Sequence, residues 1–319
     1  MSEFDLIRHL HQRINAFDQG SSSGCVVGIG DDAAVLEIPR DRQLVVSSDT
    51  LVEGVHFLKN TNAQNLGHKS LAVNLSDLAS MGARPAWFFL ALTLASPDPE
   101  WLDLFASGMG KLARSLDIVL AGGDTTSGPL SITITALGLV EPGMALTRDG
   151  AGSGDLVVVS GQLGHAAYAL ETIVAGGKPQ PEIRAALERP EPRLNLGRKL
   201  RGLATSCIDV SDGLIADLGH ILKASSLGAE IEIDLLPGAD ALAALCEGQR
   251  RQLQAAGGDD YELCFTIPTN RQSELDRISN QCACPLTVIG KINSSGELVC
   301  TTADGTVFVP RGGGYEHFV

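Results

Sequence analysis

The chain lacks long hydrophobic runs and has few basic residues. No stretch of about 18 apolar residues occurs, and the N-terminus shows no apolar core of a secretion signal. Lys and Arg number 24 against 38 Asp and Glu, which gives a formal net charge of −14. A surface this acidic repels nucleic acid and anionic membranes. We therefore expect a cytoplasmic protein with neither nucleic acid nor a membrane as its partner.

Cysteine is sparse and has no metal-site spacing. The seven cysteines are scattered, and only Cys282 and Cys284 lie close together, as Cys-x-Cys. There is no second pair at the spacing of a zinc site, and the odd number does not favour a disulfide framework. The pattern predicts reduced, mostly buried thiols.

The common nucleotide-binding signatures are also absent. No Gly-Lys pair is followed by Ser or Thr, so there is no Walker loop, and no G-x-G-x-x-G occurs. These absences disfavour Walker ATPases, Rossmann dehydrogenases and protein kinases. Residues 20–24 match G-x-S-x-G formally, but no strand before them and no helix after them is evident, which favours a flexible loop. Any phosphate chemistry must then depend on metal ions and Gly-rich backbone.

Alternating strand and helix patterns predict an α/β fold. The chain has 319 residues, of which 44% are hydrophobic, enough for two domains. Apolar and β-branched runs predict strands over 25–29, 44–48, 87–94, 118–120, 131–140, 156–160, 230–234, 262–267, 287–292 and 297–301. Amphipathic stretches predict a helix near the N-terminus and helices over 63–81, 100–116, 166–175, 181–188, 195–202, 213–225 and 271–280. The Gly-rich, charged segment 145–155 is the expected joint between domains 1–145 and 146–319.

Aspartates recur beside the predicted strands. They follow apolar runs and glycines at five places: Asp31 and Asp32, Asp49, Asp124, Asp209 and Asp212, and Asp259 and Asp260. Each place alone is typical of a turn or a helix N-cap, but five repeats at predicted strand ends favour a ligand site. Carboxylates clustered at this density need cations, and hard oxygen ligands suit Mg²⁺. Calcium and zinc are less suited, since neither an EF-hand pattern nor a His/Cys cluster occurs.

A polar stripe runs along the predicted helix over 63–81. Ser70, Asn74 and Asp77 recur at spacings of four and three residues on a helix otherwise rich in Ala, Leu and Val. A solvated helix face usually carries Lys, Glu or Arg instead of short polar side chains. We therefore expect this stripe to face a wet cleft lined with ions, with Asp77 among the ligands.

Short motifs recur along nearly the whole chain, at 28–33 (GIGDDA), 47–57 (SSDTLVEGVHF), 72–82 (AVNLSDLASMG), 122–126 (GGDTT), 146–148 (LTR), 209–214 (DVSDGL), 257–263 (GGDDYEL) and 314–318 (GYEHF). Together and in this order they resemble the motifs of the thiamine-monophosphate kinases, a family within the aminoimidazole-ribonucleotide synthetase and selenophosphate synthetase superfamily. The resemblance implies an α/β (α+β) fold of two domains, like that of aminoimidazole-ribonucleotide synthetase. The N-terminal sheet domain would bind ATP and Mg²⁺ and form a homodimer, and the C-terminal α/β domain would complete the active-site cleft.

The resemblance also implies residue roles. Several Mg²⁺ ions would be held by Asp32, Ser47, Ser48, Asp49, Asp77, Asp124, Asp209 and Asp212. ATP would be contacted by Gly123, Asp124, Arg148 and Ser211, and thiamine monophosphate by His56, Asp259 and Tyr315. Two of these positions depart from the family pattern: Ser48 stands where Thr is expected, and Asp259 stands where Glu is common.

The implied reaction is ATP-dependent phosphorylation of thiamine monophosphate to thiamine diphosphate, by direct in-line transfer without a catalytic side chain. One alternative is a selenophosphate-synthetase-like protein or another ATP-dependent member of the superfamily. Selenophosphate synthesis calls for a reactive Cys near the N-terminus, whereas Cys25 lies within an apolar run. The other alternative is a non-catalytic nucleotide-binding protein, which would be expected to lose some of the metal-binding acids.

Overall fold

A computed structural model of the chain describes residues 3–15, 24–238, 240–312 and 314. Tyr315 and most of the motif at 314–318 lie outside these residues, as does most of the 20–24 segment. The chain divides into two compact units. Unit 1 comprises Met1–Leu78 and Ala83–Gly143, and unit 2 comprises Ala79–Gly82 and Met144–Val319. Each unit is described by itself.

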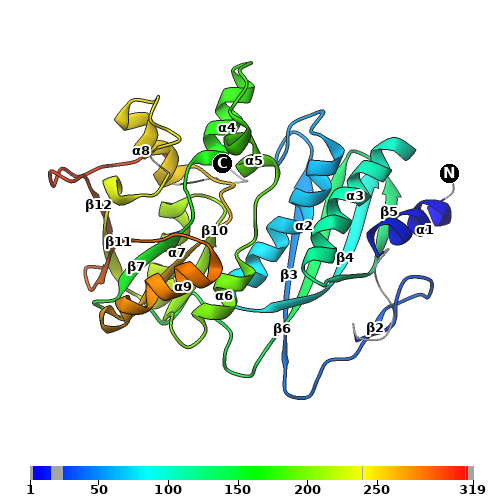
Figure 1. The fold of residues 1–319 in the computed structure, drawn as a ribbon, viewed down its shortest axis with the longest axis horizontal. Helices are drawn as coiled ribbons and strands as arrows, with labels where there is room; N and C mark the ends of the chain where they lie inside the picture. The colour runs from blue at the N-terminus through cyan, green and yellow to red at the C-terminus, as the bar shows by residue number, and fades with distance from the viewer. Residues whose placement is uncertain (1–2, 16–23, 239, 313, 315–319) are drawn as a thin grey trace. The chain divides into compact units, whose positions relative to one another are not determined.

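Unit 1 is built on a four-stranded sheet with the strand order β3-β6-β4-β5 (Figure 1). Its strands are β3 (Gln43–Val52), β4 (Arg84–Leu94), β5 (Val119–Ser127) and β6 (Ser131–Val140). Strands β4 and β5 are parallel, while β3 and β4 each pair with β6 in the antiparallel sense. The short strands β1 (Cys25–Val27) and β2 (Val35–Leu36) form a separate antiparallel pair. The edges of the larger sheet are therefore β3 and β5.

Helices cover one face of this sheet, and α1 (Glu3–Ile14) packs on α3 (Pro99–Ser115). Alternation along β3 separates the two faces, since Leu51 is 4% exposed whereas Val46 is 54% exposed. Helix α2 (Ala63–Ser80) approaches α3 closely where Gly67 faces Phe105 and Gly108 faces Gln64. A Cβ at either glycine would overlap the backbone of the other helix, so glycine permits this approach.

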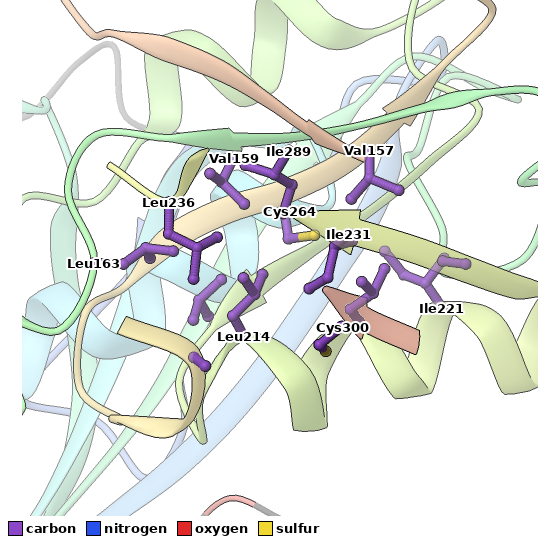
Figure 2. Close-up of a cluster of buried hydrophobic side chains, with 14 of the residues drawn as sticks. Val157, Val159, Leu163, Leu214, Ile221, Ile231, Leu236, Cys264, Ile289 and Cys300 are labelled. Atoms are coloured by element: carbon purple, nitrogen blue, oxygen red, sulfur yellow. The ribbon is translucent and has the colours of Figure 1, made fainter. Parts of the chain in front are cut away.

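Unit 2 contains a six-stranded sheet with the order β12-β9-β11-β7-β10-β8. Its strands are β7 (Leu156–Ser160), β8 (Ser206–Val210), β9 (Gly228–Glu232), β10 (Glu262–Ile267), β11 (Leu286–Asn293) and β12 (Leu298–Thr301). The pairs are antiparallel except β12 with β9, which is parallel. Figure 2 shows its core, where Val159 of β7 and Cys264 of β10 lie near Leu214, at the start of α7 (Leu214–Ser225).

The other helices of unit 2 are α4 (His165–Val174), α5 (Pro181–Glu188), α6 (Leu194–Leu200), α8 (Glu247–Ala256) and α9 (Leu275–Cys282), with short 3₁₀ turns at Ile233–Leu235 and Thr269–Glu274. Among the described residues, no helix has the length and apolar character needed to span a bilayer. The seven cysteines all lie among the described residues and form no disulfide there, and four of them are buried.

The predicted elements agree best where the apolar pattern is strong. The predictions for β6, β7, α5 and β10 match residue for residue. The prediction over 118–120 was wrong in extent, because β5 continues to Ser127 through a polar, Gly-containing stretch. Strands β2 and β8 and helix α8 were not predicted. Helix α8 is rich in Gln and Arg and has only three buried residues, so its apolar stripe is weak.

Candidate functional site

The first group of polar side chains lies between β3 and α2 in unit 1. The Ser47 hydroxyl donates a hydrogen bond to the carboxylate of Asp77. The backbone N–H of Asp49 donates to Oδ1 of Asn74 at 3.0 Å. Strand and helix are thus joined through their polar residues, and this places the Asp77 carboxylate beside Ser47.

This arrangement corrects the prediction for the polar stripe of α2. Ser70 is 0% exposed and Asn74 is 1% exposed, so these two residues do not face a wet cleft. The Ser70 hydroxyl donates to the carbonyl of Leu66 at 2.7 Å, and Asn74 donates to the carbonyl of Ser70 at 3.1 Å. Only Asp77 is partly exposed. Short polar residues suit these positions because they satisfy backbone groups at a buried helix–strand contact.

Two acids predicted at strand ends lie inside strands. Asp49 pairs with Ile134 within β3, and Asp124 lies within β5. The prediction of strand-end positions was therefore wrong for these two, whereas Asp209 lies one residue before the end of β8. Polar stretches continue as strands there because neighbouring strands supply the backbone hydrogen bonds, which local apolar pattern does not reveal.

Ser47 and Ser48 point to opposite faces of the sheet. Ser47 faces α2, whereas the Ser48 hydroxyl contacts the Thr135 hydroxyl at 2.9 Å on the other face. Successive side chains in a strand alternate in this way. The two hydroxyls therefore cannot bind the same metal ion through their side chains.

Asp49 and Asp124 lie on the two edge strands. Asp49 on β3 pairs with Ile134 on β6, which pairs with Leu90 on β4. Leu90 pairs in turn with Gly123 on β5, the residue before Asp124. Three strand spacings amount to about 14 Å. Residues paired across neighbouring strands point to the same face of the sheet. Asp124 is in register with Thr50, so its side chain lies on the face opposite to that of Asp49. The sheet therefore keeps these two carboxylates apart within one chain.

Gly123 and Asp32 lie towards the β5 side of the sheet. Gly123 has φ +152°, and a Cβ there would overlap the Leu90 backbone, so sheet packing alone requires glycine at this position. Asp32 is exposed in the loop between β1 and β2, and its N–H donates to the Asp31 carboxylate at 2.9 Å. Strand β1 contacts β5, so this loop starts near β5.

His56 lies in the turn after β3. Its Nδ1 accepts a hydrogen bond from the backbone N–H of Val52 at 3.0 Å. A neutral imidazole that accepts at Nδ1 carries its proton on Nε2. The turn therefore fixes the tautomer of His56 and makes Nε2 its donor.

Two adjacent loops bring the acids of unit 2 together. One follows β8 and contains Ser211 and Asp212, and the other precedes β10 and contains Asp259. The Asp259 N–H donates to the Ser211 carbonyl and the Tyr261 N–H to the Val210 carbonyl, each at 2.8 Å. The Tyr261 hydroxyl donates to Oδ1 of Asp259 at 2.9 Å. The structure thus gathers Ser211, Asp212 and Asp259 in one region.

Arg148 does not lie in that region. Its carbonyl accepts a hydrogen bond from the Ser225 hydroxyl at the last turn of α7, whereas Ser211 precedes the first turn. The 12 residues of α7 span about 18 Å. Unit 2 therefore holds the backbones of Arg148 and Ser211 a helix length apart.

Comparisons with known proteins give the chain its family. Residues 30–140 match the N-terminal domain and residues 152–302 the C-terminal domain of the AIR synthase related protein family. The thiamine-monophosphate kinase of Escherichia coli (strain K12) is 44% identical over 322 residues, which cover 99% of this chain and 98% of that protein. The chain belongs to the thiamine-monophosphate kinase family.

Solved structures agree with this assignment. The crystal structure of thiamine-monophosphate kinase from Stenotrophomonas maltophilia K279a is 44% identical, with a TM-score of 0.86 over 97% of this chain and 98% of that one. The AaThiL complex with AMPPCP and TMP is 29% identical, with a TM-score of 0.77 over 91% of this chain and 92% of that one. The predictions of family, fold class and kinase function are confirmed, and the selenophosphate-synthetase-like and non-catalytic alternatives are not favoured.

Two buried acids hold the unit 2 loops of the kinase, and sequence reasoning assigned this role to neither of them. Asp217 is 2% exposed, and its Oδ2 accepts hydrogen bonds from the backbone N–H groups of Ser211, Asp212 and Gly213. Burial and the nearby Asp212 carboxylate raise the pKa of Asp217 to about 7, although the three backbone donors oppose this. Its position four residues after Gly213, in the first turn of a predicted helix, was the available signal.

Asp260 stood out in the sequence only as one of the recurring acids, without a role. Its carboxylate accepts hydrogen bonds from the N–H groups of Gly164 at 2.7 Å and Ala166 at 3.4 Å, at the start of α4. Burial raises the pKa of Asp260 well above its usual range, against the effect of these two bonds. Asp260 thus turns inward as a helix cap, while its neighbour Asp259 bonds to Tyr261.

The side chains predicted to bind metal in the kinase suit Mg²⁺, but each unit brings only a few of them together. Within the described ranges, no three His, Cys, Asp or Glu side chains lie close enough together to hold a metal ion. The candidates are instead grouped as Ser47 with Asp77 in unit 1, and as the Asp209–Asp212 segment in unit 2. All of these side chains offer oxygen, the donor that Mg²⁺ prefers, and Mg²⁺ commonly takes only one or two carboxylates plus phosphate and water.

Proposed function

We propose that this kinase transfers the γ-phosphate of ATP directly to the phosphate of thiamine monophosphate, giving thiamine diphosphate, with several bound Mg²⁺ ions. The observation that carries the proposal is the full-length identity of 44% with a thiamine-monophosphate kinase. The motifs add to it, because an oxygen-bearing side chain stands at each of the proposed metal positions, with Ser48 in the place of the expected Thr.

The metal-binding role falls on Asp32, Ser47, Ser48, Asp49, Asp77, Asp124, Asp209 and Asp212. Support comes from the hydrogen bond that sets Asp77 beside Ser47, and from the position of Asp212 two residues after β8. The opposite orientation of Ser47 and Ser48 supports more than one ion. Bound Mg²⁺ would offset the negative charge of the reacting phosphates.

The nucleotide role falls on Gly123, Asp124, Arg148 and Ser211. The acceptor role falls on His56, Asp259 and Tyr315, of which Tyr315 lies outside the described residues. His56 would donate from Nε2 to the phosphate of thiamine monophosphate, as its fixed tautomer allows. Asp259 would accept from the donor groups of the vitamin, with its carboxylate oriented by Tyr261.

A homodimer is also part of the proposal. Asp49 and Asp124 lie on opposite edges and opposite faces of the unit 1 sheet, so one chain does not bring them to the same ion. The sheet face away from the helices carries exposed Leu44 and Val46 beside the hydroxyls of Ser48 and Thr50. A second copy on this face would cover its apolar side chains. A cytoplasmic location remains part of the proposal.

Direct transfer suits this residue set. The acceptor phosphate is already ionised near neutral pH, because its second pKa is about 6, so no strong general base is required. A carboxylate engaged with a cation is a poor nucleophile, which argues against an aspartyl-phosphate intermediate. The role of the chain is then to hold two anions in line and to exclude other acceptors.

The test is formation of thiamine diphosphate from thiamine monophosphate, ATP and Mg²⁺. We expect turnover that excess chelator abolishes and added Mg²⁺ restores. Direct transfer requires intersecting initial-rate plots and inversion at phosphorus. Turnover that persists in chelator would contradict the metal-dependent reading, and a phosphoprotein trapped with labelled ATP would contradict direct transfer.

A further inference from the structure

The carboxylate of Asp217, in the first turn of α7, binds the free backbone N–H groups at the N-terminus of the same helix. Its Oδ2 accepts from the N–H of Ser211 at 3.0 Å, of Asp212 at 3.1 Å and of Gly213 at 3.2 Å. Three consecutive N–H groups converging on one point form a site of the kind that binds phosphate at other helix N-termini. Here the chain's own carboxylate fills that site.

The carboxylate is held firmly because α7 is anchored in the core of unit 2. Leu214 and Leu218 of this helix are 0% exposed, and Figure 2 shows Leu214 pointing into the hydrophobic cluster. The Asp217 N–H also donates to the Gly213 carbonyl at 3.0 Å, which closes the first helical turn. The position of Asp217 is therefore set by packing, and the loop is built onto it.

The loop that Asp217 holds carries the residues proposed to act on ATP and metal. Because its backbone N–H groups point towards Asp217, its side chains and carbonyls are what remain for a ligand. The Ser211 carbonyl already accepts from Asp259, so the same loop also supports the acceptor-side loop. A substitution of Asp217 should therefore shift the backbone of Ser211 and Asp212, although Asp217 itself does not contact the substrate.

We infer that Asp217 is a positioning residue of this kinase, which sets the Ser211–Gly213 backbone so that Asp212 and Ser211 can bind metal and nucleotide. Because Asp217 engages the three N–H groups at the helix N-terminus, these groups are not available to the phosphates of ATP. At this loop the phosphates would therefore be bound through cations. The inference rests on the proposed function, because it assumes that Asp212 is a metal ligand.

The main test compares Asp217→Asn with Asp276→Asn. The comparison is made at pH 8, above the pKa of about 7, so that Asp217 is ionised. The amide of Asp217→Asn would present a neutral oxygen, and charge-assisted bonds are about twice as strong as neutral ones, so the loop should loosen. Calorimetric titration of Mn²⁺ into protein with AMPPCP, without turnover, should give an affinity weakened about tenfold, the lower end for outer-shell changes at metal sites. The Mg²⁺ concentration for half-maximal activity should rise similarly. Asp276, exposed in the first turn of α9, should change neither quantity.

A merely structural role would lower the melting temperature of Asp217→Asn but leave the Mn²⁺ affinity of the folded protein unchanged, and that result would overturn the inference. Should the variant fail to fold, amide hydrogen exchange of the metal-free native protein replaces it. The Ser211, Asp212 and Gly213 amides should be protected although they precede the helix. Exchange as fast as that of an unprotected loop would count against the inference.

Asp212→Asn separates this inference from the function on which it rests. Weakened Mn²⁺ binding in both Asp212→Asn and Asp217→Asn supports the metal role of Asp212 and the positioning role of Asp217. Weakened binding in Asp212→Asn alone leaves the metal role of the loop intact and refutes positioning by Asp217. Unchanged binding in both variants contradicts the proposed metal role of the loop itself.

Discussion

The two units hold their candidate side chains by different means. In unit 1, Ser47 and Asp49 stand on a long strand paired along its whole length, and a buried helix supplies Asp77. In unit 2, Asp212 and Asp259 stand on loops, which are held by the inward carboxylates of Asp217 and Asp260. Regular elements fix direction through the pleat, whereas loops need dedicated polar anchors.

The loops of unit 2 also contain unusual backbone. Asp259 has φ +70° and Tyr261 has φ +51°, which are left-handed conformations that cost energy for residues other than glycine. No such residue occurs within β3, where φ follows from strand pairing. The acceptor-side loop therefore stores strain that its anchors must offset, whereas the β3–α2 contact needs no such compensation.

The largest effect is expected where a carboxylate of the β3–α2 contact loses its charge. Asp77→Asn keeps an oxygen that can accept from Ser47 but removes the charge that attracts Mg²⁺, so kcat/KM should fall at least about 10–100-fold. Steady-state kinetics at saturating Mg²⁺ measures this, with Asp41→Asn, an exposed acid, as the control. Wild-type activity in Asp77→Asn would mean that this residue only joins strand and helix.

The next largest effect is a difference in stability between the two units when a polar anchor is removed from each. Asp260→Ala leaves the two N–H donors at α4 without their acceptor, which should lower the free energy of unfolding by about 1–3 kcal/mol. Asp98→Ala removes the exposed N-cap of α3 in unit 1 and should cost about 1 kcal/mol or less. Denaturant unfolding of both variants checks the order. A larger loss for Asp98→Ala would show that the loop anchor is dispensable.

His56→Ala tests the acceptor side of unit 1. Loss of a hydrogen bond to a charged phosphate is worth about 1.5–3 kcal/mol, so the KM for thiamine monophosphate should rise about tenfold or more. The KM for ATP should stay near that of the native enzyme. His220→Ala, an exposed residue on α7, is the matched control. Reduced stability with unaltered KM would assign His56 to packing alone.

The smallest effect is expected at Tyr261, which contacts Asp259 but not, on the proposal, the substrate. Tyr261→Phe removes one hydrogen bond worth about 0.5–1.5 kcal/mol, so the KM for thiamine monophosphate should rise roughly twofold to tenfold. Tyr168→Phe, on α4, should have no such effect. In an Asp259→Ala background, which removes the acceptor oxygen, Tyr261→Phe should add little, and full additivity of the two changes would argue against coupling.

The sequence predicted most of the regular elements for a local reason. Strands β6, β7 and β10 are apolar enough for their own residues to indicate them, and α5 begins with Pro181 and carries a clear apolar stripe. Strand β8 was not predicted, because Asp209 interrupts its apolar residues and makes the segment resemble a loop. The polar end of β5 is held by β4, a partner from an earlier part of the chain, and local pattern cannot register it.

The sequence by itself determined the family, the fold class and the set of oxygen side chains, because motif order and residue type are properties of the chain alone. The tertiary structure decided which of those side chains meet. Strand register set Asp49 and Asp124 on opposite edges and faces of one sheet, and helix packing buried Ser70 and Asn74. It also gave Asp217 its three donors. The physical reason is that pairing and burial join residues distant in sequence, and no single segment carries that information.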